Sequence, residues 1–279
     1  MPVLSTLYPT AFVTGASAGI GRACAEMLLA EGVRVWGTAR VPDRLAPLAP
    51  HPGFTAVALD LENPLEAEAA MLRAAAAAGG RFDLMINNAG YGLFAPFVAT
   101  EFPVWQRQIE AMLTSTLRLA HAALRGMQAQ QRGCLVNVAS LATEFPLPYM
   151  TGYNVVKAAL SAFSESLLVE TRNSGITIID FRPGDYRTSF NQAMQTHAAA
   201  PAAVADAQCA RVWQQLEANL LAAPPPARAA ADLRRALLAR RRGIVRSGSF
   251  FQAGVAPLLA RFAPSGLRRA VMWRYFGAC

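Results

Sequence analysis

The sequence predicts an α/β fold in which one doubly wound parallel sheet of about seven strands is covered by helices on both faces. Short, almost wholly apolar runs alternate along the chain with segments of helical periodicity. Strands that are apolar at nearly every position are typical of a parallel sheet buried on both sides. The chain has 279 residues, of which 53 % are hydrophobic, so it can form one large core. We therefore expect a single domain over residues 1–279.

The elements follow from periodicity and from the residues that end them. Apolar runs predict strands over residues 10–13, 33–38, 54–59, 82–86, 134–139, 176–181 and 243–246. Helical spacing, with proline near the start and glycine near the end of several segments, predicts helices over 19–31, 64–79, 151–173 and 227–242, and a long helix or kinked pair over 101–131. Residues 187–226 are alanine-rich without a strand pattern, and we interpret them as a helical lid over the substrate. Residues 250–279 form an apolar, basic tail, which we expect to contain two short helices.

Composition excludes several classes of protein. Charged residues make up only 16 % of the chain, which excludes a disordered protein. Four cysteines without paired spacing indicate reduced thiols rather than a disulfide scaffold, and three histidines outside any ligand spacing predict no metal site. No apolar run reaches the ~18 residues of a membrane span, and the start of the chain lacks a targeting pattern. We expect a cytoplasmic protein.

The basic residues are unequally divided. Of the 26 basic residues, 25 are arginine and one, Lys157, is lysine. The many arginines are explained if arginine replaces lysine at every position where only the positive charge matters. A position that needs a compact ammonium group would keep lysine, so Lys157 is a candidate functional residue.

A glycine-rich segment, TGASAGIG at Thr14–Gly21, follows the first predicted strand and opens a helix. Glycines at this place let the backbone approach a pyrophosphate, and the helix supplies free N–H groups. The candidate cofactor residues here are Gly15, Ser17, Gly19, Ile20 and Gly21. A simple tight turn between strand and helix is the alternative interpretation.

The end of the second predicted strand carries Ala39 and Arg40. An acid at this place usually binds the 2′-hydroxyl of NAD, whereas an arginine suits the 2′-phosphate of NADP. Arg40 therefore favours NADP(H) over NAD(H). The alternative is a solvated surface arginine.

Ser140, Tyr153 and Lys157 form a third pattern. Tyr153 and Lys157 are one helical turn apart, so they share a helix face, and Ser140 follows the fifth predicted strand. A tyrosine acid needs its pKa of ~10 lowered to act near neutral pH, and a nearby ammonium group favours the phenolate. We expect Tyr153 to be the proton donor, Ser140 to polarise a carbonyl oxygen and Lys157 to lower the pKa of Tyr153. A chance pair on a helix face is the alternative.

With these motifs in this order, the chain resembles the short-chain dehydrogenase/reductase family from Thr10 to about Thr188. The resemblance, which implies a Rossmann-type fold, is carried by these motifs: the glycine segment, Asp60-Leu61, NNAG at Asn87–Gly90, Ser140, the Y-x-x-x-K pattern and P-G-x-x-x-T at Pro183–Thr188. It implies Asp60 and Leu61 near the adenine, Asn88, Ala89 and Gly90 beside the cofactor, and Pro183, Gly184 and Thr188 around the nicotinamide and its phosphates, with Tyr153 and Lys157 also touching the cofactor. The 17β-hydroxysteroid and retinol dehydrogenase branch is the most similar one.

One position departs from the family pattern. Related sequences carry an asparagine, which helps to hold a water near the catalytic lysine, where this chain has Met112. Thr114, Ser115 or Thr116 could compensate, the proton relay could be impaired, or the change could be tolerated. Val156, where a small serine is common, is a milder departure.

These patterns predict an NADP(H)-dependent oxidoreductase that interconverts a ketone or aldehyde and an alcohol. Candidate substrate residues are largely apolar, which favours an apolar substrate: Ser140, Phe94, Phe145, Tyr149, Tyr186, Phe190 and Met194. The alternative function is an NADP(H)-binding sensor or interaction partner with little turnover. We expect no nucleic-acid partner and a homodimer or homotetramer. The tail could contact a membrane surface, cover the substrate pocket or form a subunit interface.

Overall fold

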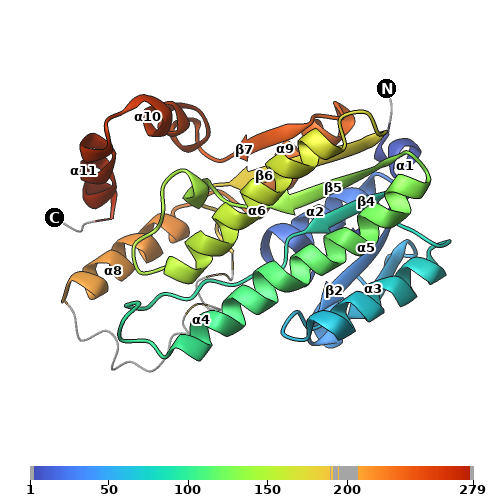
Figure 1. The fold of residues 1–279 in the computed structure, drawn as a ribbon. Helices are drawn as coiled ribbons and strands as arrows, with labels where there is room; N and C mark the ends of the chain where they lie inside the picture. The colour runs from blue at the N-terminus through green and yellow to red at the C-terminus, as the bar shows by residue number, and fades with distance from the viewer. Residues whose placement is uncertain (1–2, 189, 191–193, 195–206, 277–279) are drawn as a thin grey trace.

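A computed structural model describes residues 3–188, 190, 194 and 207–276. Seven parallel strands form one sheet in the order β3-β2-β1-β4-β5-β6-β7, with helices on both faces (Figure 1). The chain winds outward from β1 in one direction and, after crossing back to β4, in the other. The carboxyl ends of β1 and β4 therefore flank the switch point, where doubly wound folds bind ligands.

The strands and helices occupy the following residues. The strands are β1 (Thr10–Val13), β2 (Arg34–Ala39), β3 (Phe54–Ala58), β4 (Leu84–Asn87), β5 (Gly133–Val138), β6 (Ile176–Pro183) and β7 (Gly243–Ser247). The described helices are α1 (Leu4–Leu7), α2 (Gly19–Ala30), α3 (Pro64–Ala77), α4 (Phe102–Ile109), α5 (Ser115–Ala129), α6 (Thr151–Glu170), α8 (Ala207–Leu221), α9 (Pro226–Leu238), α10 (Ala256–Phe262) and α11 (Ser265–Tyr275). The doubly wound fold predicted from the alternation of apolar runs and helices is confirmed.

Two apolar layers hold the helices on the sheet. Residues of α1, α2 and α9 pack against one face around Leu28, Val35 and Leu233. Residues of α3, α5 and α6 pack against the other around Met71 and Leu119. Apolar burial on both faces is the dominant stabilising term for such a sheet, and it fixes the strand ends that carry the site.

Some boundaries differ from the predictions. The fourth strand was expected from residue 82 but begins at Leu84, because the Asp83 carboxylate accepts hydrogen bonds from the backbone and hydroxyl of Thr10. Phe82 instead packs against the rings of Phe12 and Trp36. The short helix α1 was not expected, since four residues are too few to show helical periodicity.

The segment predicted as a long helix or a kinked pair contains α4 and α5, joined by a π-helical turn at Glu110–Thr114. Such turns insert a residue into the helical ladder and are frequent at functional sites. This one presents Met112 to the site. Part of the predicted lid, residues 189, 191–193 and 195–206, lies outside the described residues; α8 and the start of α9 belong to the described part.

Of the helices in the described part of the chain, none is both long enough and apolar enough to cross a membrane.

Candidate active site

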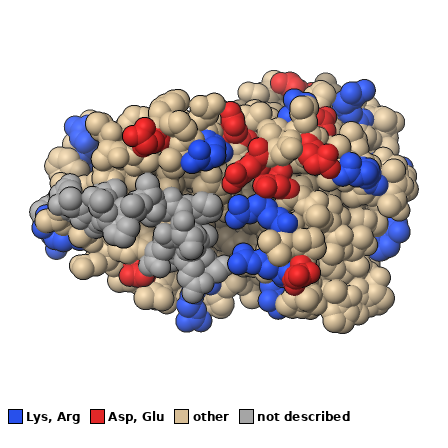
Figure 2. Space-filling view, turned by 90° about the horizontal axis from the view of Figure 1, so that it is seen from below, with Lys and Arg blue, Asp and Glu red and all other residues tan. Residues whose placement is uncertain are grey.

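A cavity of about 640 Å³ opens at the carboxyl ends of the strands. We call the part lined by residues that follow β1 to β4 the cofactor half, and the part lined by residues that follow β5 and β6, together with the tail, the substrate half. Figure 2 shows a hollow on this side of the molecule with basic and acidic side chains gathered beside it. One continuous cavity thus connects the glycine segment with the tail.

The glycine segment forms a cradle that side chains would fill. Gly15 and Gly19 have φ angles of 69° and 56°, in the left-handed region that favours glycine. A Cβ atom on Gly21 would lie 2.3 Å from both the Asn88 amide nitrogen and the Gly15 carbonyl oxygen. These three glycines are therefore required by the geometry of the turn.

The segment after β4 is fixed against this cradle by hydrogen bonds. The Thr14 hydroxyl accepts from the backbone N–H groups of Asn88 and Ala89, each at 2.9 Å. The Asn88 amide donates to the Thr14 carbonyl at 2.9 Å. Helix α2 begins at Gly19 without a side-chain cap among the described residues, so its first N–H groups are free to bind phosphate. The residues present fit the pyrophosphate of a dinucleotide.

Arg40 lies at the rim of the cofactor half. Ala39 is buried, while the Arg40 side chain is 54 % exposed and lies 3.5 Å from a Glu62 carboxylate oxygen. Such exposed ion pairs contribute little to stability. Asp60 accepts a hydrogen bond from the Glu62 backbone at 3.0 Å, and it lines the cavity together with Leu61.

Arg44 and Glu62 also line the cofactor half but were not predicted. The signal for Arg44 was present, because it follows Arg40 by four residues and lies in the short 3₁₀ helix Pro42–Leu45.

The polar trio of Ser140, Tyr153 and Lys157 meets between the two halves. The Ser140 side chain accepts a hydrogen bond from the Ala142 backbone at 3.0 Å and also hydrogen-bonds with Tyr153. The Lys157 Nζ atom lies 5.5 Å from the centroid of the Tyr153 ring and donates to the Val138 carbonyl at 2.6 Å. The structure thus brings together the three residues that the sequence singled out.

The electrostatics of the trio differ from the prediction. Burial raises the pKa of Tyr153 to about 12, which outweighs the lowering by its hydrogen bond with Ser140, and the Asp185 carboxylate raises this pKa further. Burial lowers the pKa of Lys157 to about 8, opposed by the Asp180 charge. The expectation that Lys157 holds the pKa of Tyr153 below ~10 is therefore wrong in this structure, because desolvation of the phenolate dominates.

The residues around Met112 form an apolar patch beside the trio. Met112 is buried against Val156, and its Cε atom would lie 2.8 Å from a Cβ on Gly90. Thr114 is exposed, while Ser115 and Thr116 donate their hydroxyls to the carbonyls of Leu61 and Met112. The three hydroxyls that could have replaced the family asparagine thus point elsewhere or are already bonded.

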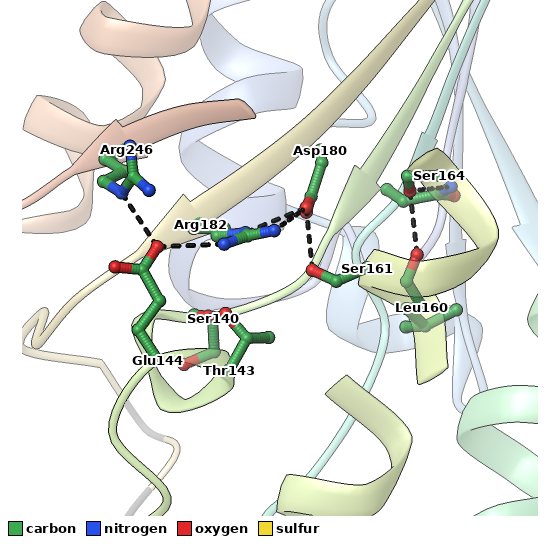
Figure 3. Close-up of polar contacts among 10 residues, drawn as sticks. Ser140, Thr143, Glu144, Leu160, Ser161, Ser164, Asp180, Arg182 and Arg246 are labelled. Carbon is green, nitrogen blue, oxygen red and sulfur yellow. Dashed lines mark hydrogen bonds and ion pairs between the residues drawn. The ribbon is translucent and has the colours of Figure 1, made fainter. Parts of the chain in front are cut away.

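An ion network contains Asp180 (Figure 3), whose charge acts on Lys157. Asp180, fully buried on β6, accepts from Arg182 at 2.7 Å and from the Ser161 hydroxyl at 2.7 Å. Glu144, just after the turn that follows Ser140, pairs with Arg182 at 2.9 Å and with Arg246 at 2.8 Å. The network therefore joins β6, β7 and the Ser140 turn.

The substrate half is apolar over most of its surface, and its wall includes the predicted residues Phe145, Tyr186, Phe190 and Met194. The Phe190 ring packs edge-on against Tyr153, with ring centroids 5.7 Å apart.

Two other predicted substrate residues, Phe94 and Tyr149, lie outside the cavity wall. They pack against one another, and Phe94 also packs against Trp213. They therefore support the wall from behind.

The tail also contributes to this half of the cavity, which was one of the three roles considered for it. Its lining residues are Phe251, Gln252, Ala256, Leu259, Val271, Met272, Tyr275 and Phe276.

The loop after β6 links the two halves. Pro183, Gly184 and Thr188 all line the cavity, and the Thr188 side chain lies 3.3 Å from the place of a Cβ on Gly19. This loop therefore passes over the glycine cradle. Its Asp185 also lines the cavity and was not predicted, although an acid directly after Pro183-Gly184 was a visible signal.

No group of three or more histidine, cysteine, aspartate or glutamate side chains among the described residues could hold a metal ion.

Comparison with known proteins identifies similar chains. The family model for short chain dehydrogenases matches residues 9–199. The 3-oxoacyl-(acyl-carrier-protein) reductase FabG of Vibrio cholerae is 33 % identical over 186 residues, which cover 66 % of this chain and 76 % of the relative.

Two solved structures show the same fold. The L-sorbose reductase of Gluconobacter frateurii, complexed with NADPH and L-sorbose, is 28 % identical with a TM-score of 0.71, covering 86 % of this chain and 95 % of that one. A short-chain dehydrogenase/reductase of Burkholderia phymatum, in complex with NAD, has a TM-score of 0.78 at 22 % identity and covers 94 % of each chain. The site described above thus occurs on a fold shared with NAD- and NADPH-bound proteins.

Proposed function

The chain belongs to the short-chain dehydrogenase/reductase family, whose members are oxidoreductases acting on CH–OH and C=O groups, and from this premise we propose that it is an NADP(H)-dependent enzyme that interconverts an apolar ketone or aldehyde and its alcohol. The observation that carries the proposal is the meeting of Ser140, Tyr153 and Lys157 beside the glycine cradle in one cavity. The 17β-hydroxysteroid and retinol dehydrogenase branch stays a prediction.

The chain's residues divide the work as follows. The nicotinamide nucleotide, when bound, supplies or accepts the hydride. The Tyr153 hydroxyl holds the proton and donates it to the carbonyl oxygen during reduction, while the Ser140 hydroxyl polarises the same oxygen. Lys157 holds the ribose and places positive charge beside the phenol. Since burial raises the pKa of Tyr153 to about 12, the phenol stays protonated at neutral pH, which suits the reductive direction.

Two features support the finer parts of the proposal. Arg40, with Arg44 near it on the same rim, offers a guanidinium to a 2′-phosphate, and Ala39 leaves no acid to bind a 2′-hydroxyl. The wall of Phe145, Phe190 and Met194 favours an apolar substrate over an acidic one. Residues 187–226 remain the proposed lid.

A substrate screen tests the proposal against the alternative of a sensor with little turnover. NADPH and NADH are titrated by nucleotide fluorescence, and turnover of a panel of alkyl and aryl ketones is followed by the absorbance of the reduced nicotinamide. Tight NADPH binding together with turnover supports an enzyme. Tight binding without turnover of any ketone, alcohol or aldehyde supports the sensor, for which Met112 is the supporting observation.

The tail supports a second proposal, that residues 250–276 contact an anionic membrane surface. In Figure 1, α10 and α11 form an arch at one end of the molecule near α8. Nine of the 19 exposed large hydrophobic side chains among the described residues lie there: Phe250, Phe251, Leu258, Leu259, Phe262, Leu267, Val271, Trp273 and Tyr275. Phe251, Leu259, Val271 and Tyr275 also line the cavity, so the other five carry the proposal.

The charge of the tail favours a lipid surface over a second copy of the chain. Residues 250–279 include Arg261, Arg268, Arg269 and Arg274 but no acid. Two such tails would repel one another, whereas anionic headgroups attract them.

We expect the protein to bind phosphatidylglycerol vesicles but not phosphatidylcholine vesicles. This binding should weaken with salt and be lost when the four arginines are replaced by glutamine. Equal binding to both vesicles, or to neither, contradicts the proposal. The cytoplasmic location and the homodimer or homotetramer stay predictions.

A further inference from the structure

One carboxylate faces the otherwise apolar substrate half. Asp185 follows Pro183-Gly184 at the carboxyl end of β6 and lines the cavity. The other acids among the described lining residues, Asp60 and Glu62, belong to the cofactor half, beside Arg40. Asp185 is thus the one described acid in the substrate half of the cavity wall.

The two oxygens of Asp185 have different surroundings. Oδ2 accepts from Gln252 Nε2 at 2.6 Å and from the Tyr275 hydroxyl at 3.1 Å, and both donors belong to the tail. In residues 3–188 and 207–276, no hydrogen bond to Oδ1 and no arginine or lysine within 4.0 Å of the carboxylate is found. Asp180, on the strand that precedes Asp185, differs in having a paired cation, Arg182, although its own Oδ1 also has no hydrogen-bond partner among the described residues. Tail contacts therefore account for one oxygen of Asp185 and leave the other without a partner.

Oδ1 of Asp185 is accessible from the cavity rather than fully buried, so a ligand that carries positive charge could form a charge-assisted hydrogen bond with it. Burial raises the pKa of Asp185, in line with an uncompensated charge. A hydroxyl could also donate to Oδ1, but only a cation balances the charge, and an acidic group would be repelled. Asp185 also raises the pKa of Tyr153, so its charge acts at the place where the proton is transferred.

From this geometry we propose that Asp185 binds an ammonium group of an otherwise apolar substrate, close to the carbonyl group that Tyr153 protonates. This inference rests on the proposed function, which it deepens by naming the substrate class: amphiphilic amino ketones and amino alcohols. Oδ1 would accept from the ammonium group while Oδ2 keeps its bonds to the tail. Asp185 would then fix which end of the substrate faces the trio.

A matched pair of ketones tests the proposal: a long-chain 2-amino ketone and its N-acetyl derivative, which has the same chain but no charge. We expect wild type to favour the amino ketone in kcat/KM by at least about tenfold, the effect of one charge-assisted hydrogen bond. Asp185→Asn should abolish this preference, so that its kcat/KM values for the two ketones lie within about threefold of one another. No preference in wild type, or an unchanged preference in the variant, overturns the proposal.

Tyr275→Phe is the matched control, because it removes a tail hydrogen bond to Oδ2 and keeps the carboxylate. The amine preference should survive in it. If Asp185 only anchors the tail, both variants lower kcat/KM for both ketones alike. If it instead serves the nicotinamide, Asp185→Asn changes the Kd of NADPH and slows both ketones equally. Either result contradicts an ammonium site.

A binding measurement separates this inference from the proposed function. Dodecylamine and dodecan-1-ol are titrated into the protein–NADPH complex, with nucleotide fluorescence as the readout. If wild type reduces neither ketone, yet binds the amine more tightly than the alcohol and loses this selectivity in Asp185→Asn, the proposed activity fails and the ammonium site stands. Equal binding of the two ligands overturns the site whatever the turnover.

Discussion

The cofactor half and the substrate half of the cavity are assembled from different kinds of segment. The cofactor half comes from short turns that directly follow β1, β2, β3 and β4, and its shape is set by backbone features such as the positive φ angles of Gly15 and Gly19. The substrate half combines residues from Phe145 to Phe276, drawn from a loop, the described part of the lid, α8 and the tail.

This difference has a physical origin. A phosphate is recognised by N–H groups and close backbone approach, which a local glycine pattern provides. An apolar substrate is recognised by the shape of a wall, which depends on the packing of distant segments. The cofactor half should therefore respond to mutation at single positions, and the substrate half should respond through the arrangement of its segments.

The largest expected effect lies between the two halves. Tyr153→Phe should lower kcat by about 10²- to 10⁴-fold, the usual contribution of a general acid, with the Kd of NADPH within about twofold of wild type. Steady-state turnover and nucleotide fluorescence measure the two quantities. In the oxidative direction the phenolate must accept the proton, so the wild-type rate should keep rising with pH toward the pKa of about 12. Tyr275→Phe, which also removes a cavity hydroxyl, is the control that keeps this pH slope. Substantial turnover in Tyr153→Phe would remove the assigned mechanism.

The free energy of unfolding should depend most on the ion network around Asp180 and Arg182. Arg182→Met leaves the fully buried Asp180 without its cation, and breaking a buried pair in this way costs about 3–5 kcal/mol. Arg246→Met is the matched control, because that side chain is 33 % exposed and pairs only with Glu144 among the described residues; it should cost at most about 1 kcal/mol. Urea unfolding of both variants measures the difference. Similar losses of unfolding free energy in Arg182→Met and Arg246→Met would show that the buried ion pair does not stabilise the end of β6.

Lys157 tests whether charge alone suffices at the trio. Lys157→Arg should lose activity at least about 100-fold, nearly as much as Lys157→Met, because a planar guanidinium cannot take the place of a compact ammonium group. Near-wild-type turnover in Lys157→Arg would contradict this argument.

The same position should show the opposite effect on stability. The pKa of Lys157 falls from 10.5 to about 8 on folding, so below pH 8 the folded protein holds a charge that burial disfavours. Lys157→Met should therefore raise the free energy of unfolding at pH 7 by on the order of 1–3 kcal/mol. The gain should shrink between pH 8 and 10.5, where wild-type stability rises because the unfolded chain binds the extra proton. Thermal unfolding across this pH range checks the sign, and a gain that grows with pH would contradict it.

The sequence predicted the cofactor half more completely than the substrate half. The glycine segment, Asn88 and the polar trio could be predicted because each requirement is local: a positive φ, a Cβ-free cradle, a one-turn spacing. Asp185 could not be assigned a partner from the sequence, since its donors, Gln252 and Tyr275, lie 67 and 90 residues further along the chain.

The aromatic residues predicted for the substrate wall show the same limit of sequence-based prediction. Phe94 and Tyr149 were expected in the substrate wall but pack behind it. Hydrophobicity predicts that such rings are buried, while only the tertiary packing decides which surface they face. The raised pKa of Tyr153 was missed for a similar reason, because desolvation depends on everything that surrounds the phenol.

The smallest of these effects concerns the rim of the cofactor half, where one exposed contact should select the nucleotide. Arg40→Ala should weaken NADPH binding by about tenfold and leave NADH nearly unchanged, because only NADPH carries the 2′-phosphate. Tenfold is the lower end of the range for a charge-assisted hydrogen bond, and we choose it because the Arg40 side chain is 54 % exposed and solvent screens the contact.

Glu62 sharpens the same prediction, since its carboxylate lies 3.5 Å from Arg40 and would compete with the phosphate for the guanidinium. Glu62→Gln should therefore strengthen NADPH binding by a few-fold, and the gain should disappear in the Arg40→Ala background. Arg44→Ala is the neighbouring control, because it removes an equal charge from the same rim. Fluorescence titrations at low and high salt measure all four variants with both nucleotides. Equal losses of NADPH and NADH affinity in Arg40→Ala would show that the arginine serves the adenosine generally. A loss of NADPH affinity in Arg44→Ala alone would assign the 2′-phosphate contact to Arg44 in place of Arg40.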